Sequence, residues 1–380
     1  MDKIFLFARD PGGANVIIPL IKALKKNKYE LLVYGKDVAL EKFKKEKISA
    51  KNIELECKEI NPDHIENLLI NLKPKIVITG TSADDYTEKF LWSVSKKLGI
   101  GTFAILDQWM NYGIRFSEYS VSDIEKYEIA KIHKYIPDKI FVMDEYSKNK
   151  IIEEGISKEK IIVVGHPHFE YIQKKSKEIQ LDKIDKYKEK INLQRDEILI
   201  VYASEPLLKT YGKLADGSDY WGYNEKTNFE ELCRVLQNKI DKTNIKFRVI
   251  VKLHPKEDDN SYDELLKYYN GQQLNIIIEK KEDPLIVIKS ADIVIGMSSM
   301  FLLESVSLNK EVMSLQINLK QDNPFILDKI GILKSITKRE ELINYFENID
   351  KKSSNTDFNI ELNSVARIID YLEGYICQKN

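Results

Sequence analysis

The chain has 380 residues, of which 43% are hydrophobic and 31% are charged, a composition typical of a folded globular protein with room for two α/β domains. Its 59 Lys and Arg residues balance its 60 Asp and Glu residues, so the formal net charge of −1 gives no general attraction to nucleic acid. The three cysteines lie far apart without metal-ligand spacing, which argues against a disulfide framework and against a zinc site.

The N-terminal residues enter an apolar run at once and lack the basic and apolar regions of a signal peptide. No uninterrupted apolar run approaches the length of a membrane span. We therefore expect a cytoplasmic protein, and peripheral contact with the inner face of the membrane stays open.

The first predicted strand, at residues 3–8, leads through a glycine-containing loop into a helix at residues 16–24. Gly12 and Gly13 in this loop would let the backbone approach a ligand closely. The loop is neither a Gly-x-Gly-x-x-Gly fingerprint nor a Walker motif, so support for a dinucleotide or ATP site is weak. Asp10 is a candidate carboxylate here, and a turn or capping role is the alternative.

Polar residues also follow two later strands of the first half. The strand at residues 74–79 leads through Thr-Gly-Thr-Ser to Asp84 and Asp85, which suggests another loop over the same cleft. The strand at residues 102–106 delivers an acid, two amides and two aromatic rings within six residues, beginning with Asp107, Gln108 and Trp109. Aromatic faces and amides suit sugar or base recognition, and the alternative is that the aromatic rings clamp the loop onto the core.

The first half closes with a strand at residues 161–164 that runs into Gly-His-Pro-His and so delivers His166 and His168. Residues 174–195 are heavily charged and lack an apolar stripe wide enough for a core helix. We interpret them as the inter-domain segment.

The second half opens with a strand at residues 197–203, followed by Ser-Glu-Pro and by a Gly- and Tyr-rich stretch at 207–227 without clean periodicity. A later strand at 247–253 runs directly into His254, a proline and Lys256. Ligands of parallel sheets bind beyond the carboxyl ends of the strands, so His254 is a candidate site residue, although a lone histidine is more often structural.

The most informative stretch begins with the β-branched run at residues 293–295, which ends at Gly296 and is followed at once by Ser298 and Ser299. A helical pattern follows, with Glu304 one and a half turns into it. Strand, glycine turn, hydroxyl pair and helix N-terminus together predict a phosphate site, and an ordinary serine N-cap is the alternative.

We expect the strands that end at His254 and at Gly296 to be neighbours, so that a histidine, Lys256 and two serines share one crevice. Strands alternate with helices through both halves, which predicts an α/β fold of two Rossmann-like doubly wound domains. The expected boundaries are 1–178 for the first domain, 179–355 for the second, and 356–380 for a C-terminal helix that packs back on the body.

The His-Pro pair at 254–255, the serine pair and Glu304 resemble the C-terminal half of the glycosyltransferase-B superfamily. The resemblance is nearest to its users of cytidine nucleotides, namely sialyltransferases, Kdo transferases and CDP-glycerol glycerophosphotransferases. It implies two domains facing across a cleft, with His254 and the serines on the donor's phosphate or cytidine. It also implies that Glu304 contacts the ribose. The loops of the first domain then face the acceptor and the transferred group, with these candidates: Gly12, Gly13, Asp84, Asp85, Gln108 and Trp109.

The expected function is a glycosyltransferase that moves a sugar from a CMP- or CDP-linked donor to a hydroxyl of a glycan, lipid-linked or protein acceptor. Its base should come from the first domain, with Asp10 first, Asp107 second and His166 third. No Asp-x-Asp stands at a strand end, so we expect neither a metal nor another cofactor. The alternatives are a CDP-alditol phosphotransferase, a hydrolysing sugar-nucleotide epimerase and a non-catalytic nucleotide-sugar binding module. No nucleic-acid partner is expected.

Overall fold

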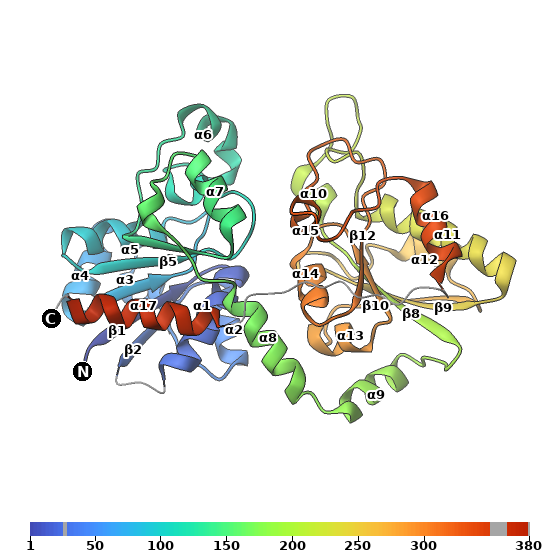
Figure 1. Cartoon of the computed structure of the whole chain (residues 1–380), viewed down its shortest axis with the longest axis horizontal. Helices are drawn as coiled ribbons and strands as arrows, with labels where there is room; N and C mark the ends of the chain where they lie inside the picture. The colour runs from blue at the N-terminus through green and yellow to red at the C-terminus, as the bar shows by residue number, and fades with distance from the viewer. Residues whose placement is uncertain (26–28, 350–362, 379–380) are drawn as a thin grey trace. The chain divides into compact units, whose positions relative to one another are not determined.

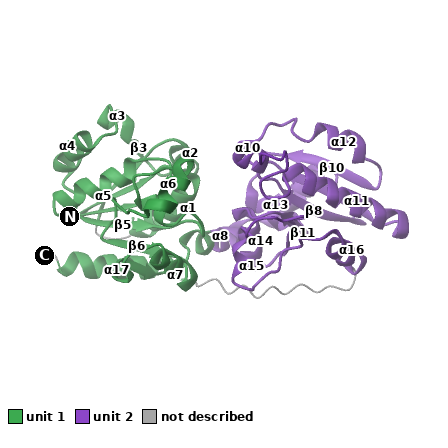
Figure 2. Cartoon of the chain, turned by 90° about the horizontal axis from the view of Figure 1, so that it is seen from above, with its two compact units in different colours: residues 1–171, 360–380 green, residues 172–359 purple. Residues whose placement is uncertain are grey.

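The computed structural model describes residues 1–25, 29–349 and 363–378. The chain forms two compact units, Met1–Tyr171 with Ile360–Asn380 (unit 1) and Ile172–Asn359 (unit 2) (Figure 1, Figure 2). The division falls inside α8 (Pro167–Glu178), the helix at whose end the sequence placed it. Of the C-terminal segment expected at 356–380, residues 356–362 and 379–380 lie outside the described residues.

Unit 1 contains a seven-stranded parallel sheet with the strand order β3-β2-β1-β4-β5-β6-β7. The strands are β1 (Lys3–Ala8), β2 (Glu30–Gly35), β3 (Lys51–Asn52), β4 (Ile76–Thr79), β5 (Gly101–Ile105), β6 (Lys139–Val142) and β7 (Ile161–Val163). Its central strands are continuous buried runs, as expected for a parallel sheet covered by helices on both faces.

The helices of unit 1 are α1 (Pro11–Leu24), α2 (Val38–Lys45), α3 (Ile53–Cys57), α4 (Pro62–Leu72), α5 (Thr87–Lys97), α6 (Ile124–Ala130), α7 (Glu145–Glu153), the start of α8, and α17 (Ser364–Gln378). The C-terminal helix α17 buries Ile368, Leu372 and Ile376 in the same core as α1. Its first turn is capped by Glu170, whose carboxylate accepts from the Ser364 hydroxyl and the Val365 amide.

The first helix begins five residues earlier than the sequence suggested. Pro11 occupies its first turn, where the fixed φ of proline favours a helix and no backbone N–H is lost. Gly12 and Gly13 therefore belong to α1 and not to a loop. Gly13 packs against the backbone of Gly80, on which a Cβ would lie 2.7 Å from the Gly13 Cα.

Unit 2 contains a five-stranded parallel sheet with the order β10-β9-β8-β11-β12. The strands are β8 (Glu197–Ala203), β9 (Lys246–Lys252), β10 (Leu274–Glu279), β11 (Ile293–Gly296) and β12 (Glu311–Ser314). The helices are α9 (Leu181–Lys190), α10 (Leu207–Tyr211), α11 (Glu225–Thr243), α12 (Asp263–Tyr269), α13 (Pro284–Ser290), α14 (Met300–Ser307), α15 (Ile326–Lys329) and α16 (Arg339–Glu347), besides the end of α8.

The prediction of two Rossmann-like α/β domains is confirmed. The charged segment 174–195 differs from expectation, because it is largely helical: α9 packs against α13 and buries Ile184 and Tyr187. The stretch 207–227 is also more ordered than expected. It contains α10 and a cluster in which Tyr211 stacks on Tyr220 and Trp221 contacts both rings edge-on.

Candidate functional site

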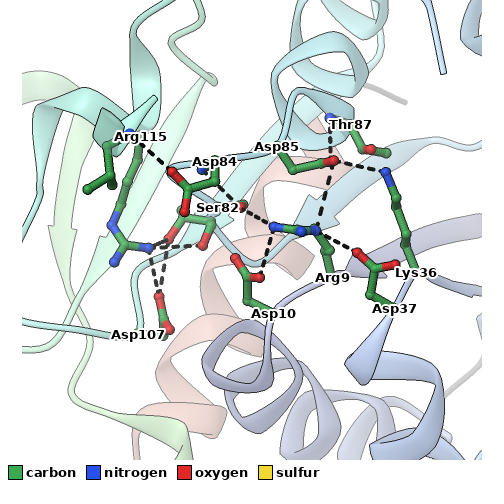
Figure 3. Close-up of polar contacts among 12 residues, drawn as sticks. Arg9, Asp10, Lys36, Asp37, Ser82, Asp84, Asp85, Thr87, Asp107 and Arg115 are labelled. Carbon is green, nitrogen blue, oxygen red and sulfur yellow. Dashed lines mark hydrogen bonds and ion pairs between the residues drawn. The ribbon is translucent and has the colours of Figure 1, made fainter. Parts of the chain in front are cut away.

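The carboxyl ends of β1 and β4 carry a group of charged side chains in unit 1 (Figure 3). Arg9 lies between its acids: its Nη1 is 3.2 Å from Asp10 Oδ1, and its Nε is 2.8 Å from Asp37 Oδ2 and 3.9 Å from Asp85 Oδ2. Burial tends to lower the pKa of Arg9, but the hydrogen bond to Asp37 and the three negative charges raise it overall. Asp10 stays partly exposed and makes no capping hydrogen bond to α1, so its carboxylate is accessible.

Asp84 and Asp85 both have local structural partners. Asp85 accepts from Lys36 Nζ and from the amide of Thr87, the first residue of α5, each at 2.9 Å. Burial would raise the pKa of Asp85, but these hydrogen bonds lower it below the usual value. Asp84 accepts from the Val121 amide at 3.0 Å. Both acids therefore hold loops together at this edge of the sheet.

Asp107 follows β5 and is buried, with 3% of its surface exposed. Its Oδ1 accepts from Arg115 Nη1 at 3.1 Å and from the Thr81 hydroxyl at 3.3 Å. Burial raises the pKa of Asp107, and the positive charge of Arg115 opposes that shift. A Cβ on Gly12 would overlap Asp107 Oδ2, so only glycine at position 12 lets this carboxylate approach the first turn of α1.

The aromatic residues after β5 hold the loop against β7 and α8. Trp109 donates to Asp144 Oδ2 at 2.6 Å, and its ring stacks on His166 with centroids 5.4 Å apart. His166 is buried with Nε2 3.2 Å from the Asp107 carbonyl oxygen, and burial together with the nearby His168 lowers its pKa to about 3. A histidine so placed is a weak base. This is the clamping arrangement that we weighed as the alternative. Gln108 beside them is half-buried, and no described residue hydrogen-bonds to its side chain.

In unit 2, the expected adjacency of the strands that end at His254 and Gly296 is wrong. β8 lies between β9 and β11, and Gly296 pairs with Ala203. A Cβ on Gly296 would lie 2.9 Å from the Ala203 carbonyl oxygen, so close strand approach requires glycine there. The loop after β8, which begins Ser204-Glu205, thus stands between the two predicted motifs.

Glu257 ties the loops after β8 and β9 together. Its two oxygens accept from the Ser204 hydroxyl at 2.7 Å and from the His254 amide at 2.8 Å. His254 Nδ1 accepts from the amide of the exposed Lys256 at 3.1 Å, which leaves Nε2 as the protonated nitrogen. Burial and then Lys256 lower the pKa of His254, so it is neutral at pH 7 and presents an N–H donor.

Glu205 is a candidate site residue that the sequence analysis missed. The Ser298 amide donates to its Oε1 at 2.7 Å, and the Ser298 hydroxyl donates to its Oε2 at 3.2 Å. Ser299 is the N-cap of α14, and its buried hydroxyl oxygen has no partner among the described residues. Glu304 is half-buried in the same helix. The Ser-Glu-Pro sequence at a strand end was the available signal.

The described residues contain no group of three His, Cys, Asp or Glu side chains that could hold a metal ion. None of the helices in the described ranges is long and apolar enough to cross a membrane.

Comparison with known proteins finds likeness in structure only, since no family model and no curated protein matches the sequence. Among similar solved structures, UDP-GlcNAc 2-epimerase from Methanocaldococcus jannaschii has a TM-score of 0.68 at 17% identity, covering 98% of this chain and 99% of that one. The Neisseria meningitidis UDP-GlcNAc 2-epimerase bound to UDP-GlcNAc has a TM-score of 0.68 at 16% identity, covering 98% and 100%. S. aureus MnaA bound to UDP has a TM-score of 0.65 at 17% identity, covering 99% and 97%.

A glycosyltransferase from Rickettsia africae is also similar, with a TM-score of 0.58 at 15% identity, covering 100% of this chain and 99% of that one. Together these comparisons show a two-domain glycosyltransferase-B-like fold. They overturn the expected main function. The nearness to users of CMP- or CDP-linked donors is not supported, because the similar structures are named as UDP-GlcNAc 2-epimerases. The short motifs that suggested cytidine serve phosphate binding in general, so they could not identify the base. An epimerase was one of the alternatives weighed above, and epimerase is the activity in the names of these similar structures.

Proposed function

We propose that this chain is a hydrolysing epimerase that inverts C2 of a UDP-N-acetylhexosamine and releases UDP. One observation carries the proposal: the likeness to UDP-GlcNAc 2-epimerases runs through both units, covering 98% of this chain and 100% of the Neisseria meningitidis enzyme. Each unit has polar residues at the carboxyl ends of its own strands, and these are the candidates for the donors and acids that such a reaction needs.

The proposed chemistry has two halves. A base takes the proton from C2 while the C1–O bond to UDP breaks, so that the electron pair forms a C1=C2 double bond. Water then adds at C1, and a proton returns to C2 from the opposite face. The reaction therefore needs a base on one face of C2, a proton drawn from solvent and delivered on the opposite face, and donors for the charge on the departing diphosphate.

Asp10 is the proposed base that takes the proton from C2, because it is partly exposed and Arg9 holds its carboxylate in place. Asp107 is buried against Arg115, so we assign it a positioning role. In unit 2, the Nε2–H of His254, the serine pair and the N-terminus of α14 are the proposed diphosphate donors. Glu304 is the proposed acceptor for the ribose hydroxyls.

The test is incubation of the purified chain with UDP-GlcNAc in D₂O, followed by proton NMR. We expect UDP and N-acetylmannosamine carrying deuterium at C2, with no acceptor present. Asp10→Asn should lower turnover about 10²- to 10⁴-fold and leave UDP affinity nearly unchanged. UDP-GlcNAc that binds but stays unchanged, or UDP released without deuterium at C2, would contradict an epimerase.

A further inference from the structure

Glu205 places a negative charge where the proposed function needs a phosphate. The residue follows β8, the middle strand of the unit 2 sheet, and both of its carboxylate oxygens accept hydrogen bonds from Ser298 just before α14. Backbone N–H groups at a helix N-terminus are the donors that anions take in proteins. The carboxylate of Glu205 thus occupies the donors that a phosphate oxygen would use.

No ion pair offsets the charge of Glu205. Within the described ranges, no lysine, arginine or histidine is its partner, and its side chain accepts from Ser298. Burial, and to a smaller extent the charge of Glu205, raises the pKa of four tyrosines from several elements: Tyr202 on β8, Tyr211 on α10, Tyr223 before α11 and Tyr262 before α12. The carboxylates of Glu225 and Glu257 act on Tyr202 and Tyr262 as well.

The protonation state of Glu205 is therefore open to change near neutral pH. Burial raises its pKa to about 7, although the hydrogen bonds from Ser298 and the backbone of Met297 and Ser299 oppose the shift. A phosphate cannot share these donors with the ionised carboxylate, because two like charges at hydrogen-bond distance repel. The unpartnered hydroxyl of Ser299 at the same helix end is a further donor that Glu205 leaves unused.

We propose that Glu205 is the specificity-determining residue of the phosphate site in unit 2, and that a phosphate ligand displaces its carboxylate from Ser298 with uptake of one proton. Ligands that carry two adjacent phosphates gain the most affinity from this exchange, because they can use the Ser298 and Ser299 donors together. The choice of UDP as the ligand rests on the proposed function, whereas the exchange of carboxylate for phosphate does not.

The test is isothermal titration of UDP and of inorganic pyrophosphate at pH 6.5, 7.5 and 8.5. The proteins are the wild type, Glu205→Gln and a control, Glu311→Gln, whose carboxylate begins β12 and accepts from Tyr345. The wild type and the control should lose affinity about tenfold between pH 7.5 and 8.5, because only the protonated fraction of Glu205 is competent to bind. Glu205→Gln should lose little affinity between pH 7.5 and 8.5, because glutamine keeps the shape of the glutamate side chain and lacks its charge.

Titration of the phosphate groups of the ligand itself is the same for every protein and cancels in the comparison. Glu205→Ala, which also frees the donors, should show the same weak pH dependence and guards against a defect peculiar to glutamine. Equal pH slopes in the wild type and Glu205→Gln, or weaker binding by Glu205→Gln at every pH, would overturn the inference.

The two probes separate this inference from the proposed function. If pyrophosphate binds with a pH dependence that requires Glu205 and UDP does not bind, the result supports the inference and contradicts the proposed epimerase function. If UDP binds with the same pH dependence in the wild type and in Glu205→Gln, the result contradicts the inference and is consistent with the proposed function. If neither probe binds any of the proteins at pH 6.5, both proposals fail.

Discussion

At the scale of single residues, the contact between α1 and the loop after β5 depends on the absence of one side chain. Gly12 lies in the first turn of α1 directly against the buried carboxylate of Asp107, which Arg115 and Thr81 hold from the other side. A carboxylate held by a buried guanidinium cannot move aside without leaving the positive charge uncompensated.

Gly12→Ala should therefore destabilise unit 1 by about 1 to 3 kcal/mol, the usual cost of forcing extra atoms into a packed site. The gain in helix propensity from glycine to alanine, about 1 kcal/mol, is smaller than the upper part of that range. Urea unfolding followed by circular dichroism measures the change.

The matched control is Gly374→Ala in α17, where a Cβ would meet nothing within 4 Å. There the same substitution should stabilise unit 1 by about 0.5 to 1 kcal/mol. Equal effects of the two substitutions on the free energy of unfolding would show that the Asp107 carboxylate does not hinder a side chain at position 12.

At the scale of elements, the start of α5 combines a buried acid and a buried base, Glu88 and Lys89. Glu88 is 1% exposed, and its Oε2 has no partner among the described residues. Burial and the charges of Asp85 and Asp10 raise the pKa of Glu88 to about 8. Burial also lowers the pKa of the adjacent Lys89 to about 8, while its Nζ donates to the Tyr119 carbonyl oxygen.

The pH dependence of stability follows from the direction of these shifts. Between pH 4.5, the ordinary value for Glu88, and pH 8, the folded state holds a proton that the unfolded state releases. The unfolded state therefore binds fewer protons, and Glu88 makes stability fall as pH rises through this window. Lys89 acts in the opposite direction, but only between about pH 8 and its ordinary value of 10.5.

Glu88→Gln should remove the first of these effects. Its free energy of unfolding relative to the wild type should increase steadily from pH 5 to pH 8, as measured by urea unfolding at each pH. A constant difference across that range would mean that Glu88 is not protonated in the folded state.

At the scale of the whole molecule, the proposed reaction assigns all charge stabilisation to protein donors. The N–H of His254, the serine pair and the N-terminus of α14 lie at the carboxyl edge of one sheet and are the proposed partners of the diphosphate. Release of UDP from UDP-GlcNAc should therefore proceed at an unchanged rate in excess EDTA. Loss of activity in EDTA with recovery on added magnesium or manganese would contradict this assignment.

The sequence by itself was sufficient for the architecture. Buried β-branched runs alternate with amphipathic helices, and this local pattern dictates parallel strands between helix layers, as both units show. The sequence also predicted the polar residues at the strand ends. Each follows directly after a buried run, where the strand leaves the core and reaches solvent or a ligand. Asp10, Asp107, His254 and Ser298 all lie at such ends.

Only the tertiary structure decided which of these strand ends meet. Strand order is a property of long-range pairing and leaves no mark in a local pattern, so nothing in the sequence placed β8 between β9 and β11. That order puts Glu205 on the Ser298 amide and joins Ser204 to the His254 loop through Glu257. Burial was equally hidden: His166 and Asp10 both follow strands, yet the tertiary packing encloses one and leaves the other partly exposed. The short motifs could indicate a phosphate, because phosphate recognition needs only a helix N-terminus and hydroxyl groups. The rest of a ligand is recognised by residues from many segments that are distant in the sequence, so no short motif identifies it.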